Sequence, residues 1–116
     1  ALVATVVFEF MHVADELAGN WAPFTPMNDP MVATVSMGVF TTVGMVALWG
    51  MLAARSWGYG AAVLFGLFFL VAEVWHSVDP SNMTAFRWVV VGLAQASAMA
   101  VIVLGTNGLR HQLPWR

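Results

Sequence analysis

Hydrophobic and polar positions divide the chain into four apolar stretches joined by short polar links. The clearest stretch covers residues 31–54 and contains no charged side chain. A helix of about 20 apolar residues crosses the hydrocarbon core of a bilayer, which is about 30 Å thick. Residues 31–54 therefore predict a membrane-spanning helix.

Three further stretches resemble the first one less closely. Residues 58–78 are apolar as far as Glu73, and residues 86–105 have their only charge, Arg87, near the start. Residues 1–18 combine an apolar first half with several ionisable side chains in the second half. We predict that all three stretches also form spanning helices, with residues 1–18 showing the weakest pattern.

The links support this division of the chain. Residues 19–30 contain three prolines and a glycine, which predicts a non-helical segment. Pro80 marks a helix boundary, and Asn107–Gly108 is expected to end the last helix. Four helices with short links predict an all-α integral membrane protein, a single domain built as an up-down-up-down bundle. The pattern also fits two tandem helical hairpins.

The composition points in the same direction. Of the 116 residues, 60% are hydrophobic and 9% are charged, whereas about a quarter of the residues in a soluble domain are charged. The chain has no lysine, which excludes a retinal Schiff base and argues against nucleic acid as a partner. It also has no cysteine, which excludes disulfides and thiolate metal sites.

The arginines predict an orientation. Arg55, Arg110 and Arg116 fall on one side of the predicted bundle, and Arg87 falls on the other side. Because cytoplasmic loops carry an excess of positive charge, both termini are expected in the cytoplasm, with the protein in the plasma (inner) membrane.

A repeated motif carries the candidate chemistry. The sequences FEFMHVAD (residues 8–15) and AEVWHSVD (residues 72–79) share the pattern Glu-x-x-His-x-x-Asp, and the second copy follows the first by 64 positions. Residues three apart on a helix are close neighbours and can address one point. Ionisable groups inside a membrane are costly unless they pair, face water or bind a ligand. The candidate site residues are Glu9, His12, Asp15, Glu73, His76 and Asp79.

Several kinds of site fit this motif. The motifs can be polar contacts between helices or subunits. They can also hold a transition metal, because imidazole suits copper, iron and zinc and carboxylate widens the choice. Di-iron bundles use Glu-x-x-His twice, but they need a further Glu from each of the other two helices, which this chain lacks. Finally, His12 and His76 can ligate a haem between diagonal helices or ligate a chlorin, or a His/Asp pair can hold a quinone carbonyl.

We therefore expect a small membrane subunit of a larger redox assembly, with other membrane protein subunits and the lipid bilayer as partners. It would bind copper, iron or haem near the outer face through Glu9, His12, Glu73 and His76. Asp15 and Asp79 would be secondary ligands or would orient the histidines.

Two alternative functions remain open at this stage. The first is a non-catalytic structural or assembly subunit. The second is a small proton-coupled transporter, since the size and helix count resemble the small multidrug-resistance transporters, which place a glutamate in the first helix where this chain has Glu9. Residues 58–66 depart from the pattern of that family's third helix.

Overall fold

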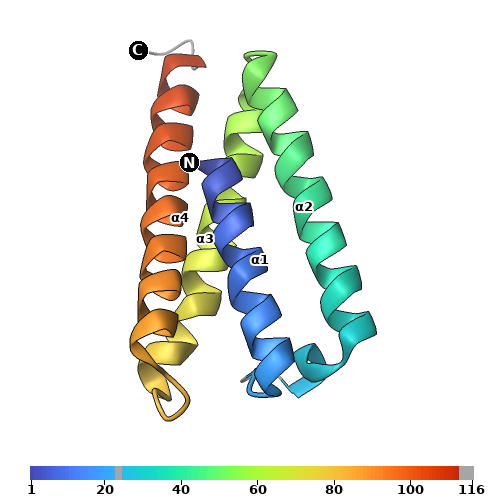
Figure 1. Ribbon diagram of the computed structural model, residues 1–116. Helices are drawn as coiled ribbons and strands as arrows, with labels where there is room; N and C mark the ends of the chain where they lie inside the picture. The colour runs from blue at the N-terminus through green and yellow to red at the C-terminus, as the bar shows by residue number, and fades with distance from the viewer. Residues whose placement is uncertain (23–24, 113–116) are drawn as a thin grey trace.

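The computed structural model describes residues 1–22 and 25–112, and this part of the chain is all-helical (Figure 1). It contains four α-helices and one short 3-10 helix: α1 (Leu2–Gly19), η1 (Thr25–Asn28), α2 (Pro30–Leu52), α3 (Ser56–Val78) and α4 (Ala85–Gln112). The four α-helices occupy the four apolar stretches of the sequence.

Three of these helices are long and apolar enough to cross a membrane, namely α2, the Ser56–His76 part of α3, and α4. Their length and composition are those of membrane spans. Helix α1 is shorter and carries three acidic side chains, Glu9, Asp15 and Glu16, and it is not among these three.

The helices pack around a common axis. Helix α3 packs against α4 and α2, and α1 also packs against α4 and α2. Direct contact between α1 and α3 is slight, so these two helices lie diagonally opposite each other. In Figure 1 the α1–α2 and α3–α4 connections lie together at the bottom, whereas the α2–α3 link and the C-terminal end of α4 lie at the top.

Local capping explains where α1 ends and α2 begins. Asn20 adopts a left-handed conformation (φ 52°), and its backbone N–H donates to the last turn of α1. Asn tolerates this conformation better than most residues. At the start of α2, Asp29 Oδ1 accepts from the backbone N–H of Met31 at 2.8 Å and of Val32 at 3.1 Å, while Pro30 takes the first helical position. This is the usual preference at a helix start.

Two details of the sequence prediction are wrong. Helix α4 does not end at Gly105 or at Asn107–Gly108 but continues to Gln112. Gly108 is a packing residue, because a Cβ at this position would collide with the Tyr59 ring of α3. In addition, the proline-rich link between residues 19 and 30 contains the short helix η1.

Small residues bring the helix backbones together. A Cβ on Gly50 of α2 would lie 2.7 Å from Cα of Gly58 in α3, so the two helices touch through their glycines. Ala47, Ala62 and Ala94 are fully buried. Close approach through small residues is typical of packing between membrane helices. This packing joins α2 to α3 next to their connecting link, at the opposite end of α3 from Glu73 and His76.

Candidate metal centre

Helices α1 and α3 bring five ionisable side chains into the interior of the bundle. Glu9, His12 and Glu16 lie on one face of α1, and Glu73 and His76 lie on one face of α3. Each of the five is at most 6% exposed, in a chain whose interior is otherwise largely apolar. Buried ionisable groups are rarely tolerated without partners, which makes this cluster the leading candidate for a functional site.

The two histidines meet at the centre of the cluster. Nε2 of His12 lies 2.8 Å from Nε2 of His76, and the rings are nearly perpendicular, with an angle of 88°. A neutral imidazole carries one N–H and one acceptor nitrogen. This contact fits a single hydrogen bond, in which one Nε2 carries the proton and the other Nε2 accepts it.

Two glutamates surround the histidine pair. Oε1 of Glu16 lies 3.2 Å from Nε2 of His12 and 3.5 Å from Nε2 of His76. Glu73 places Oε1 3.7 Å from Nε2 of His12 and Oε2 3.6 Å from Nε2 of His76. The two Nε2 atoms therefore lie within 3.7 Å of each other and of carboxyl oxygens from two glutamates. A bound cation would satisfy the acceptors that this arrangement gathers.

Among the described residues, His12, Glu73 and His76 form a group able to hold a metal ion, because their ligand atoms all lie within 4.8 Å of one another. Two ligands of a tetrahedral ion, each about 2.1 Å from the metal, are separated by about 3.4 Å. The separations between each histidine nitrogen and Glu73, 3.6 and 3.7 Å, are close to that value. The two histidine nitrogens, 2.8 Å apart, are closer together than this value, so they would have to move apart to bind one tetrahedral ion together with Glu73.

Several buried polar atoms around this group have no hydrogen-bond partner within the described part of the chain. They are Oε1 of Glu9, Nδ1 of His12 and Oε2 of Glu73. Leaving a buried polar atom unsatisfied costs about 1–3 kcal/mol. The cluster thus retains acceptor capacity that the chain itself does not use, as expected of residues that bind a ligand.

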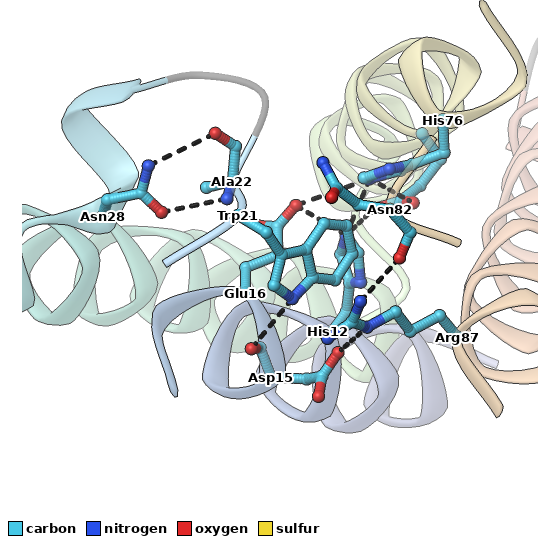
Figure 2. A network of polar contacts seen from close by, with 10 residues as sticks. His12, Asp15, Glu16, Trp21, Ala22, Asn28, His76, Asn82 and Arg87 are labelled. Carbon is cyan, nitrogen blue, oxygen red and sulfur yellow. Dashed lines mark hydrogen bonds and ion pairs between the residues drawn. The ribbon is translucent and has the colours of Figure 1, made fainter. Parts of the chain in front are cut away.

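A second layer covers the histidines on the side of the α1–α2 and α3–α4 connections (Figure 2). The Trp21 ring contacts both imidazoles edge-on, at centroid distances of 5.7 Å to His12 and 5.6 Å to His76. Trp21 Nε1 donates to the backbone carbonyl of Asp15 at 3.0 Å. The guanidinium of Arg87 lies 4.1 Å from the centre of the Trp21 ring, and its Nε donates to Asp15 Oδ2 at 2.6 Å. These contacts fix the indole over the candidate site.

The structure separates the six residues of the repeated motif into two groups. It brings together Glu9, His12, Glu73 and His76. The two aspartates lie elsewhere: Asp15 pairs with Arg87, and Asp79 is exposed at the start of the α3–α4 connection. Hydrogen bonds from Ser81 hold the pKa of Asp79 below its usual value. Asp15 thus orients the covering tryptophan instead of a histidine, and Asp79 lies outside the cluster.

Sequence reasoning missed Glu16. This residue lies outside the repeat, because the position equivalent to it after α3 is Pro80. The available signal was its spacing, since Glu16 follows His12 by four residues and therefore shares its helix face.

Comparisons of the chain with protein-family models, with curated proteins and with solved structures find no match.

Proposed function

We propose that this protein is a membrane subunit that binds one transition-metal ion, copper or iron, through His12, Glu73 and His76. Glu16 completes the site from the α1 side, and Glu9 lies beside it. The protein crosses the membrane four times in an up-down-up-down bundle, with the metal site towards the outer face and both termini in the cytoplasm. It serves as a small subunit of a larger redox assembly.

The observation that carries this proposal is the 2.8 Å approach of the two Nε2 atoms between buried carboxylates. Burying several ionisable groups in an apolar bundle costs free energy unless they pair or coordinate a metal. Two imidazoles and one carboxylate are a ligand set that transition metals accept, and the Glu16 carboxyl group lies beside them. Bound there, such an ion would supply Lewis acidity or an electron-transfer centre, and the chain's own residues would fix its ligands and exclude water.

The direction of the side chains favours a ligand over a contact with another subunit. Polar contacts to a neighbouring subunit require Glu and His side chains on the outer surface of the bundle. Here Glu9, His12, Glu73 and His76 are 2–4% exposed in the isolated chain, so they face its own interior. The assembly-subunit alternative then requires the cluster to be only internal polar packing, and metal-binding measurements separate the two.

Several features support four spans. Glu9 and Glu16 are the acidic side chains of α1 that would be hardest to place in a membrane. Both are buried inside the bundle and do not face lipid. Asp15 is neutralised by Arg87 near the end of the helix. The apolar residues Val3, Val7 and Phe10 remain exposed on the outer surface of α1, where lipid or another subunit would cover them.

Metal binding to the purified, detergent-solubilised protein tests the proposal. The protein is stripped with chelator and dialysed separately against Cu²⁺, Fe²⁺ and Zn²⁺, and bound metal is measured per chain. We expect about one ion of copper or iron per chain in the native protein and loss of binding in both His12→Ala and His76→Ala.

His111→Ala is the matched control, because His111 lies in the last turn of α4, at the other end of the molecule. Asp79→Asn is a second control, because Asp79 is exposed outside the cluster. Both controls should bind as the native protein does. Undiminished binding in the two cluster variants, or no binding by the native protein, contradicts the proposal and leaves internal polar packing as the role of the motif.

A further inference from the structure

A cavity of about 650 Å³ adjoins the metal centre between α1, α2 and α3. This volume lies within the usual range for small-molecule sites, about 300–1,000 Å³. One part of its wall is the ionisable cluster itself. Most of the remainder is apolar or aromatic and includes Met37 and Phe40 of α2 and Phe68, Phe69 and Trp75 of α3.

The rim of this cavity lies on the outer surface of α3. Phe68, Val71 and Trp75 line the cavity and are 51%, 70% and 53% exposed. All three belong to the Ser56–His76 segment, which is long and apolar enough to cross a membrane. In a bilayer these side chains would face hydrocarbon, so an occupant would reach the cavity from the lipid phase and would itself be largely apolar.

The inner wall of the cavity favours an occupant that also carries a hydrogen-bond donor. Glu9 and Glu73 both line the cavity, and each is at least 97% buried. Glu9 Oε1 and Glu73 Oε2 accept no hydrogen bond from any described residue. A ligand that donated a hydrogen bond to one of them would satisfy a buried acceptor that is otherwise unpaired.

The wall beside these carboxyl groups is aromatic. The Phe40 ring packs against Phe68 and Phe69 with centroids 5.0 Å and 5.1 Å apart. Aromatic side chains favour stacked or edge-on contacts with another ring. A ring that carries a hydroxyl group would therefore match both parts of the wall.

We propose that the cavity binds a lipid-soluble phenol, with its ring against Phe40 and Phe69 and its hydroxyl donating to Glu9. This inference goes beyond the proposed metal site and names the class of molecule that would lie beside it. Its test is separate, because phenol binding is measured on both metal-loaded and chelator-stripped protein.

The probe is radiolabelled 4-octylphenol, titrated onto the protein in lipid nanodiscs, with binding to empty nanodiscs subtracted. Its methyl ether, 4-octylanisole, has the same ring and tail but no donor. We expect saturable binding of the phenol and roughly tenfold weaker binding of the ether, as for one lost hydrogen bond.

Two variants locate the site. Glu9→Met removes the acceptor at similar volume and should bring the affinity for the phenol down to that for the ether. Ser36→Phe fills the cavity from α2 and should abolish binding of both compounds, because Ser36 lines the cavity. Thr34→Phe is its matched control on the exposed face of α2 and should bind as the native protein does.

Equal affinity of phenol and ether, or unchanged phenol binding in Ser36→Phe, overturns the inference. So does saturable binding of octylamine without binding of the phenol, since that result marks a cation site. The metal content of every sample is measured in parallel. Metal without phenol binding rejects this inference alone, and phenol binding without metal rejects the proposed metal site alone.

Discussion

His12 and His76 lie 64 positions apart in the sequence, yet their Nε2 atoms approach to 2.8 Å at the centre of the bundle. The approach joins α1 and α3, which lie diagonally opposite each other and have little other direct contact. The histidine pair and its carboxylates thus form the main link between these two helices. A ligand that bridged the two imidazoles would stabilise the bundle as well as occupy the site.

Glu16 should matter for metal affinity without being essential to it. Its Oε1 lies 3.2 Å and 3.5 Å from the two Nε2 atoms, and it is not in the group formed by His12, Glu73 and His76. Loss of a group that orients metal ligands typically weakens affinity about 10- to 100-fold. We expect Glu16→Gln to fall in this range in a competition assay with a chelator of known affinity, and Glu73→Gln to lose more. The reverse order would mean that Glu16, not Glu73, is the direct ligand.

The Asp15–Arg87 pair should contribute to stability through its position between α1 and α4. The 2.6 Å contact involves side chains that are 32% and 21% exposed, so solvent screens it in part. Exposed ion pairs contribute up to about 1 kcal/mol, and we expect a coupling free energy of about that size. A double-mutant cycle with Asp15→Asn and Arg87→Gln, measured by unfolding in detergent, gives this value.

The same cycle can be followed by tryptophan fluorescence, because Asp15 Oδ2 holds the Arg87 guanidinium that lies over the Trp21 ring. Both single variants should shift the emission of the protein, and neither should do so in a Trp21→Phe background, since the chain has five other tryptophans. Additive effects on stability together with unchanged emission would show that the pair neither couples the helices nor positions the indole.

Gly58 should be irreplaceable by alanine, whereas Gly60 should not. A Cβ at Gly58 would collide with the backbone of Gly50 in α2, but one at Gly60 would meet nothing within 4 Å. Both glycines lie in α3, where alanine is favoured over glycine by about 1 kcal/mol. Gly60→Ala should therefore raise the thermal unfolding temperature in detergent, and Gly58→Ala should lower it. Similar shifts in the two variants would contradict the backbone contact between α2 and α3.

Ala54 should gain stability when replaced by glycine. It lies in the link between α2 and α3 with φ of 51°, a left-handed conformation that glycine adopts more easily. The left-handed conformation costs a residue with a Cβ about 1–2 kcal/mol, although glycine also gives up more backbone entropy on folding. We expect Ala54→Gly to raise the free energy of unfolding by about 1 kcal/mol, and Ala53→Gly, at the neighbouring residue with φ of −81°, to lower it. An Ala54→Gly variant less stable than the native protein would refute this reading of the link.

Much of the architecture could be predicted because it depends on local pattern. The apolar stretches located the four helices, and the repeated motif indicated which residues of α1 and α3 lie closest to one another. The end of α4 was not predictable in this way. From the sequence, Gly108 is expected to end the helix. Only the position of Tyr59 on the neighbouring helix α3 shows that Gly108 is a packing residue.

The site could be predicted only as far as the repeat extends. The roles of Glu16, Trp21 and Arg87 depend on the rotation of each helix about its axis and on the path of the α1–α2 link. Neither is encoded in the spacing of the motif. The two aspartates show that the motif also predicts too many ligands. Their place in the motif suggested that they bind the metal or orient the histidines. In the structure Asp15 pairs with Arg87, and Asp79 lies in an exposed turn.

X-ray absorption spectroscopy of the metal-loaded protein shows whether both histidines bind the metal, because it counts the imidazoles around the ion. If His12 and His76 share one ion, the native protein gives multiple scattering from two imidazoles with metal–nitrogen distances of about 2.0 Å, and His76→Ala, whose weakened site is filled only at high metal concentration, gives scattering from one imidazole. A spectrum without imidazole scattering, or one that is identical in the native protein and in His76→Ala, would contradict the claim that the two histidines share one metal ion.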